Sequence, residues 1–155
     1  MASQTTGVGH GRRAARMRNT ELTIPTGRRR GVFDITQECA DFVSGEGEGD
    51  GEGLLNVFVP HATAGLVIME TGSGSDDDLV DILDRLLPRD DRAYRHRHGS
   101  PGHGADHLVP LLAAPTLTVP VVDGRMALGT WQSICLLDPN TDNATRTVRL
   151  SFVSG

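Results

Sequence analysis

The chain has 155 residues, with 20 acidic and 15 basic side chains and a formal net charge of −5. All of these basic residues are arginine, so chemistry that needs a Schiff-base lysine or a Walker A lysine is excluded. The acidic balance and an aromatic content of 4% argue against nucleic acid and against an anionic membrane surface as partners.

The N-terminal part of the chain predicts a tail followed by one domain. Residues 1–18 are polar and rich in arginine, which is typical of a disordered arm, and the domain is expected over residues 19–155. Residues 21–24 alternate in polarity and predict a first strand. A helix is expected next, with Asp34 as its cap and an apolar stripe of Ile35, Cys39, Phe42 and Val43.

The middle of the chain predicts a loop, two strands and a second helix. Residues 45–53 alternate glycine with acidic side chains and indicate a solvated loop, followed by strands at 54–59 and 65–70. Ser75 is a typical N-cap, and the helix after it has an expected buried stripe of Leu79, Ile82, Leu83 and Leu86. Residues 89–106 are polar and glycine-rich, hence a loop.

The C-terminal part is expected to be mostly strands. Residues 116–122 lead into Asp123-Gly124, which favours a type I′ hairpin turn. Further strands are expected at 126–128, 131–137 and 145–153. About seven strands and two helices, without βα alternation, predict an α+β fold.

The cysteines and the absence of targeting signals predict a cytoplasmic protein. Cys39 and Cys135 lack CxxC spacing, and we expect buried, reduced thiols. The sequence has no apolar run of transmembrane length and no signal-peptide core, so we expect no membrane contact.

Four histidines lie close together in the predicted loop: His96, His98, His103 and His107. Glycines let such a loop present several imidazoles to one point, and imidazole suits zinc, nickel, copper or iron. Asp106 is placed to orient one of the rings. A solvated surface loop is the alternative, and the spacing matches no strict metal signature.

Two further residues follow apolar strands and are candidates for chemistry. His61 closes the strand at 54–59 and is expected either to line a cleft or to make a structural hydrogen bond. Glu70 ends the next strand and suits a general base or a partner of a histidine.

The segment from Arg125 to Gln132 interrupts the strand pattern with polar residues. Thr130, Trp131 and Gln132 indicate a pocket or an interface edge, whereas a core tryptophan is the alternative. Arg125, with Arg146 or Arg149, is suited to bind a phosphate, although salt bridges on a strand face explain these arginines equally well.

These pieces together resemble the YjbQ family, also called UPF0047, whose members are often labelled secondary thiamine-phosphate synthase. The matching residues are His61-Ala-Thr-Ala, the strand to Glu70, the helix to Pro88, Tyr94-x-His96, Ala105-x-His107-Leu108 and the segment from Val119 to Gln132. The resemblance runs from about Thr20 to the C-terminus.

The resemblance implies two packed, mainly antiparallel β-sheets with two main helices, assembled as a homotrimer around a histidine-lined metal site. By position it implies His61, His96 and His107 as metal ligands, with Glu70 and His61 as catalytic residues. Trp131 and Gln132 match the family motif and, with Arg125 and Thr130, are the substrate-binding candidates. His98 and His103 have no clear counterpart. The expected metal is zinc, or magnesium with a diphosphate substrate.

The implied activity joins hydroxymethylpyrimidine diphosphate to thiazole phosphate, releasing diphosphate and giving thiamine phosphate. Two alternatives stay open: a non-catalytic metal- or anion-binding trimer, and a metal-dependent hydrolase of a phosphorylated metabolite. The sequence therefore leaves it undecided whether the protein is an enzyme.

Overall fold

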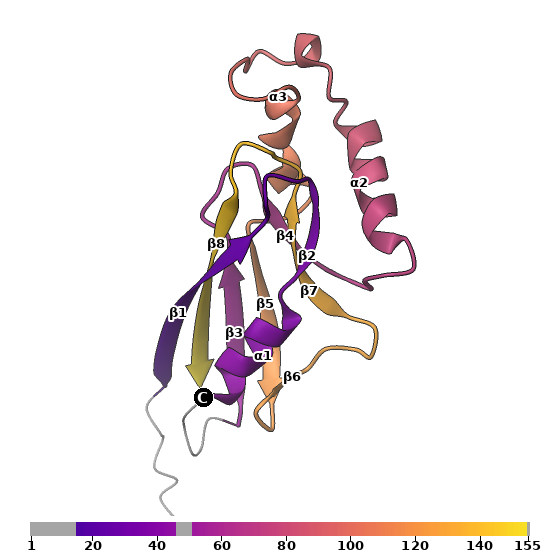
Figure 1. Cartoon of the computed structure of the whole chain (residues 1–155). Coiled ribbons are helices and arrows are strands. Elements are labelled where there is room, and N and C mark those ends of the chain that lie inside the picture. The colour runs from indigo at the N-terminus through magenta and orange to yellow at the C-terminus, as the bar shows by residue number, and fades with distance from the viewer. Residues whose placement is uncertain (1–14, 46–50, 155) are drawn as a thin grey trace, which may run out of the picture.

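The computed structural model describes residues 15–45 and 51–154, which form two antiparallel sheets with helices beside them (Figure 1). The larger sheet has the strand order β1-β8-β3-β5-β6, and the smaller sheet has the order β2-β7-β4. The strands are β1 (Arg16–Pro25), β2 (Gly31–Asp34), β3 (Gly53–Phe58), β4 (Gly65–Met69), β5 (Thr116–Val122), β6 (Arg125–Met126), β7 (Ser133–Asp138) and β8 (Thr145–Ser154). The helices are α1 (Thr36–Ser44), α2 (Ser75–Leu86) and α3 (His103–Asp106), with 3-10 turns at Asp91–Ala93 and Val109–Leu111. The predicted α+β fold with antiparallel sheets is confirmed.

The core is formed by the inward-facing residues of both sheets. In β8, Val148, Leu150 and Phe152 are fully buried and alternate with more exposed residues, as a half-buried strand requires. Ile134 and Leu136 of β7 belong to the same cluster and are also fully buried. Burial of one such side chain contributes about 1.5–3 kcal/mol, so this shared layer holds the two sheets together.

The N-terminal strand is longer than expected. β1 begins at Arg16, inside the predicted tail of residues 1–18, because Arg16–Pro25 pairs with β8 along its whole length. The rest of the predicted tail lies outside the described residues, as does 46–50 of the predicted glycine-acid loop. β2 was not expected, since its four residues show no pattern of their own and pair only with β7.

Helix α2 buries less of its apolar stripe than the sequence predicts. Leu83 is 4% exposed, whereas Ile82 is 47% and Leu86 is 61% exposed, so their predicted burial is wrong for this chain. The helix lies along one side of the molecule and contacts β2, and of its predicted stripe only Leu79 and Leu83 belong to the apolar cluster with Val67 and Leu137 (Figure 1). No helix in the described ranges is long and apolar enough to cross a membrane.

The two cysteines are buried free thiols, as predicted. Cys39 and Cys135 have no exposed surface, and neither forms a disulfide. Burial raises the pKa of each thiol to about 12. Because the thiolate is the nucleophile, these cysteines are structural side chains without catalytic reactivity.

Gly65, at the start of β4, is predicted to be intolerant of any side chain. A Cβ atom there would lie 2.1 Å from the carbonyl oxygen of Ala113. Gly65→Ala should therefore lower the free energy of unfolding by about 2–3 kcal/mol, measured by urea denaturation. Gly31→Ala is the matched control, since its Cβ would meet only Phe33 at 4.0 Å, and should cost less than about 1 kcal/mol. Equal losses in both variants would contradict the close approach.

Candidate metal centre

The histidine loop lies above the end of the sheets, between α2 and β5 (Figure 1). Gly99 and Gly102 have φ angles of +85° and +86°, which favour glycine. A Cβ at Gly102 would lie 2.4 Å from the guanidinium carbon of Arg89, and one at Gly104 would lie 2.8 Å from the Cβ of Tyr94. The glycines therefore allow the loop to fold back tightly on itself.

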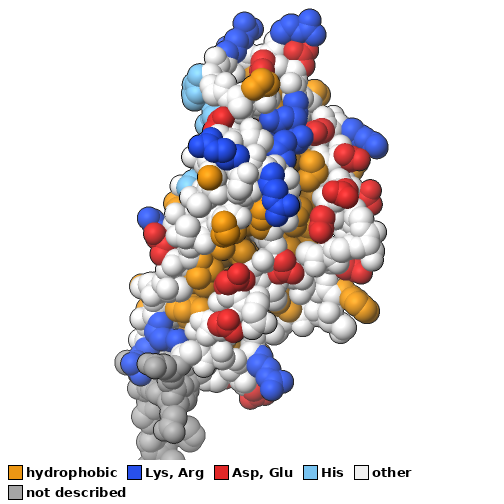
Figure 2. All heavy atoms as spheres, viewed as in Figure 1, with side chains coloured by type: hydrophobic (Ala, Val, Ile, Leu, Met, Phe, Trp, Pro, Cys, Tyr) orange, Lys and Arg blue, Asp and Glu red, His pale blue; other side chains and the backbone are white. Residues whose placement is uncertain are grey.

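Three imidazoles converge in this loop. One ring nitrogen from each of His96, His103 and His107 lies within 4.8 Å of the others. The Nε2 atoms of His103 and His107 are 2.9 Å apart. The ring of His98 is also near, with its centroid 4.0 Å from that of His96. In the view of Figure 2, histidine side chains reach the surface in the upper part of the molecule, near arginine side chains.

A carboxylate from a distant part of the chain fixes the ring of His103. Nδ1 of His103 lies 2.6 Å from Oδ2 of Asp142, and because a carboxylate only accepts, the ring nitrogen is the donor. Desolvation raises the pKa of Asp142, but hydrogen bonds from Asn140, Ser100 and His103 outweigh it and lower that pKa to about 2. Asp142 therefore stays ionised and leaves Nε2 of His103 facing the other histidines.

A buried polar network holds this arrangement on the sheets. Asp106 is fully buried, forms an ion pair with Arg89 and accepts a hydrogen bond of 2.9 Å from the amide of Asn140. Asn140, also fully buried, accepts in turn from Arg146 at 3.4 Å. The predicted orienting carboxylate, Asp106, thus contacts Arg89 and Asn140, while Asp142 contacts the histidine.

The environment of His96 and His107, two of the converging imidazoles, favours their neutral form. Desolvation lowers the pKa of His107, and the neighbouring histidines lower it further. The pKa of His96 is lowered by the same two causes. A metal ligand must be an unprotonated imidazole, so these shifts favour the form that can bind a metal at neutral pH.

His61 is not part of this group. Its Nε2 accepts a hydrogen bond of 2.9 Å from the backbone N–H of Thr147. Desolvation and the charge of Arg146 lower the pKa of His61. The structure therefore brings together His96 and His107 of the predicted ligand set, and it adds His103 where the set had His61.

Glu70 lies at the opposite end of the smaller sheet from the histidine loop. β4 and β7 are antiparallel, with Gly65 opposite Leu137 and Met69 opposite Ser133. Glu70 therefore lies near the start of β7, whereas Asn140 and the histidine loop lie beyond its end. A strand rises about 3.4 Å per residue, so six residues of β7 hold the two regions roughly 20 Å apart.

The predicted substrate-binding residues also lie away from the histidines. Arg125 and Gln132 line a cavity beside α1, at the end of the molecule opposite α3 (Figure 1). Thr130 is exposed outside that lining, and Trp131 is 72% exposed, so the alternative of a core tryptophan is wrong. The other arginines considered for a phosphate are paired: Arg146, which is buried, with Asp138, and Arg149 with Glu21.

The fold and the site together define a two-sheet α+β protein with a histidine cluster at one end of its sheets. The profile of the UPF0047 protein YjbQ-like family matches residues 20–155. The chain is 60% identical over 134 residues to a UPF0047 protein of Mycobacterium tuberculosis, covering 86% of this chain and 96% of that one. It is 35% identical to a UPF0047 protein of Archaeoglobus fulgidus, covering 76% and 88% of the two chains.

The chain therefore belongs to the UPF0047, or YjbQ-like, family. Solved structures show the same fold. A hypothetical protein of Aeropyrum pernix matches with a TM-score of 0.79 at 29% identity, covering 89% of this chain and 99% of that one. A conserved hypothetical protein of Thermus thermophilus matches with a TM-score of 0.67 at 30% identity, covering 84% and 97%.

Sequence reasoning placed His103 in the histidine cluster, but the ligand set implied by the resemblance omitted it. His103 precedes His107 by four positions, and this spacing at the start of a helix puts both side chains on one face. Two further residues of the site were missed. Asp142 and Asn140 follow β7 more than 30 residues later in the chain, and only the fold brings them to the loop.

The contact with Asp142 predicts the tautomer of His103. In the folded protein we expect His103 to carry its proton on Nδ1, seen in long-range ¹H–¹⁵N NMR spectra of the histidines. Asp142→Ala should remove this preference and populate both tautomers. Asp90→Ala is the control, because Asp90 pairs with Arg92 in the same region. An unchanged His103 spectrum in Asp142→Ala would contradict the assignment.

Proposed function

We propose that His96, His103 and His107 bind a divalent first-row transition metal, for which zinc is the simplest choice. The observation that carries this proposal is the convergence of three imidazole nitrogens within 4.8 Å. Three histidines with an open fourth position are the donor set of a catalytic zinc site. A bound metal would act there as a Lewis acid toward a phosphate oxygen.

The donor set fits such a metal. The ring of His103 donates to Asp142 through Nδ1, which is the arrangement in which a carboxylate supports a metal-bound histidine. The Nε2 atoms of His103 and His107 lie 2.9 Å apart, so both can face one metal ion. Magnesium prefers oxygen ligands and fits these three nitrogens poorly. With a diphosphate substrate, magnesium would be bound mainly by the oxygens of the substrate.

The substrate we propose is a small phosphorylated metabolite. A small cavity of about 90 Å³ next to the centre is lined by Arg97, His98, Gly99 and Ser100, and also by Asp91, whose carboxylate accepts from the backbone N–H of Gly102. The guanidinium of Arg97 donates through Nε to the carbonyl of Tyr94, which fixes the side chain and leaves its terminal nitrogens available. An arginine fork beside a metal is suited to a phosphate.

The reaction we propose to test first is that of a thiamine-phosphate synthase-like transferase, because the family resemblance points to it. Hydrolysis of one phosphorylated metabolite is the second candidate, since a metal with an open position and a neighbouring arginine also serves that reaction. Metal or anion binding without catalysis would use the same residues. The cytoplasmic location stays a prediction.

A homotrimer is part of the proposal. In one chain Glu70 is remote from the histidines, so a catalytic role for it at this centre requires a second copy. An exposed apolar row supports self-association: Met17, Val153, Leu54 and Pro120 lie side by side across β1, β8, β3 and β5. Exposed apolar surface of this kind suits a subunit interface.

Substitution of single histidines tests the ligand set. We expect His103→Gln and His107→Gln to weaken Co²⁺ or Zn²⁺ binding by more than about 100-fold, measured by competition with a chelator. His61→Gln is the matched control and should bind as the wild type does, because His61 is bonded to Thr147 instead. Loss of binding in His61→Gln with retention in His103→Gln would establish the ligand set implied by the resemblance.

Activity is tested on the metal-loaded protein. Thiamine-phosphate formation from hydroxymethylpyrimidine diphosphate and thiazole phosphate is measured for the wild type and for His107→Ala, with phosphate release from each substrate alone measured in parallel. We expect a loss of more than about 100-fold in His107→Ala, because the metal is lost with its ligand. Formation that survives unchanged would contradict the site, and phosphate release without joining would favour the hydrolase.

A further inference from the structure

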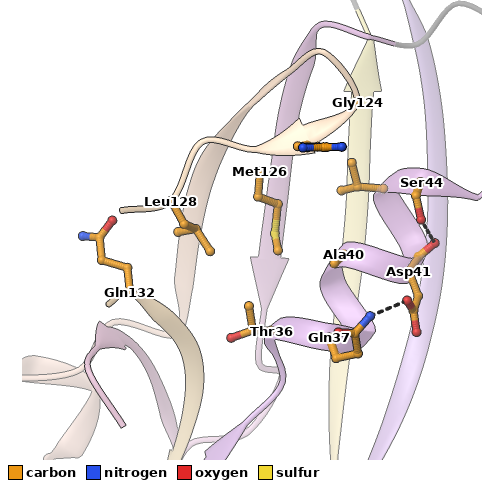
Figure 3. Close-up of a pocket in the computed structure, with 11 residues that line it drawn as sticks. Thr36, Gln37, Ala40, Asp41, Ser44, Gly124, Met126, Leu128 and Gln132 are labelled. Carbon is orange, nitrogen blue, oxygen red and sulfur yellow. Dashed lines mark hydrogen bonds between the residues drawn. The ribbon is translucent and has the colours of Figure 1, made fainter. Parts of the chain in front are cut away.

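A second cavity, of about 410 Å³, lies between α1 and the β5–β6 hairpin with its following loop (Figure 3). Its volume is in the range of small-molecule sites, which is about 300–1,000 Å³. Figure 3 shows the side chains of Met126 and Leu128 facing α1, with Ala40 and Thr36 across from them. The cavity is separated from the histidine loop by the length of the sheets (Figure 1).

Two turns build one wall of this cavity. Asp123 and Gly124 have φ angles of +50° and +72°, as the predicted type I′ turn requires, and this turn returns the chain through Arg125 and Met126. The backbone N–H of Gly129 donates to Oε1 of Gln132 at 2.8 Å. This bond fixes the amide of Gln132 and leaves its NH₂ group without a bond to any described residue.

The hairpin wall carries exposed hydrogen-bond donors, on Arg125 and Gln132, that contact solvent and no described residue. The guanidinium of Arg125 makes no ion pair or hydrogen bond with the residues that the structure describes, whereas Arg30 and Arg89 each bind a carboxylate. Gln132 lies on the far side of Leu128 from Gly124 and Met126 (Figure 3), so Arg125 by itself offers a planar set of donors at the cavity. Such a set suits a carboxylate or a phosphate.

The α1 wall carries a hydrogen-bond acceptor, the carboxylate of Asp41. Asp41 accepts a hydrogen bond of 2.7 Å from the amide of Gln37, which occupies one oxygen of its carboxylate. The second oxygen remains free to accept. Between the two polar walls lie the apolar side chains of Ala40, Val43, Met126 and Leu128. A ligand that satisfies all three regions has an anionic end, an apolar body and an N–H donor.

We propose that this cavity is a binding site for a small, flat molecule with a carboxylate or phosphate at one end and an amino group at the other. The anion binds Arg125, the flat apolar body packs on Met126 and Leu128, and the amino group donates to Asp41. The site is independent of the metal centre within one chain, because β7 separates Gln132 from Asn140 by roughly 20 Å.

The test uses 4-aminobenzoate as the probe, with benzoate and aniline as probes that lack one end each. ¹H–¹⁵N NMR titration of the full chain should shift the amide signals of Ala40, Met126 and Leu128. We expect 4-aminobenzoate to bind at least about 10-fold more tightly than either truncated probe, as loss of one charged hydrogen bond requires. 4-Aminophenyl phosphate, tested in parallel, distinguishes a phosphate site from a carboxylate site.

Substitutions test which residue binds each end of the probe. Arg125→Gln should weaken binding of 4-aminobenzoate at least about 10-fold. Asp41→Asn should weaken binding of 4-aminobenzoate to about the affinity of benzoate. Arg149→Gln is the matched control, because Arg149 is exposed on β8 of the larger sheet and pairs with Glu21. His103→Gln should leave binding of 4-aminobenzoate unchanged. The result at this cavity is therefore independent of whether the proposed metal centre binds a metal. Shifts that are absent, or equal in Arg125→Gln and Arg149→Gln, overturn the proposal.

Discussion

The ion pair between Arg146 and Asp138 joins the two sheets and supports the histidine loop. Arg146 lies on β8 of the larger sheet and Asp138 ends β7 of the smaller one, with N–O distances of 2.8 and 2.7 Å. Arg146 is 2% exposed and Asp138 is fully buried, and the same guanidinium also reaches Thr63 and Asn140. Removing one partner of such a pair costs about 3–5 kcal/mol, because the other charge is left buried.

The loop that carries the candidate metal ligands depends on this pair through Asn140. The backbone N–H of Asn140 donates to Asp138, and its side-chain amide contacts Asp106 and Asp142. Those two carboxylates then fix Arg89 and His103. A loop with little apolar burial of its own is thus ordered by hydrogen bonds that begin in the core. This explains how a polar, glycine-rich segment holds three imidazoles at one point.

Local sequence patterns predict most of the fold but only part of the candidate metal centre. The strand at 145–153 and the turn at Asp123-Gly124 are predicted from local signals, and both predictions are confirmed. The separation of Glu70 from the histidines follows from the pairing of β4 with β7, which no local pattern contains. Asp142 likewise reaches His103 only through the fold. For Ile82 and Leu86 the local pattern predicts burial that the structure does not show. An apolar stripe does not indicate how much of it another element covers.

The missing lysine limits how this chain can hold two phosphorylated molecules at once. Several arginines are already committed to carboxylates, among them Arg146, Arg89 and Arg30. Beside the candidate metal centre, Arg97 lines a cavity of about 90 Å³, which has room for one phosphate group, whereas the larger cavity with Arg125 lies at the other end of the sheets. Hydrolysis of one phosphorylated metabolite needs only the first of these. A reaction that joins two phosphorylated molecules needs both anions at one centre, and in the proposed trimer a second copy could supply the second anion site by bringing its Arg125 end to these histidines. Under the proposed function, the arrangement of subunits would therefore distinguish the transferase from the hydrolase.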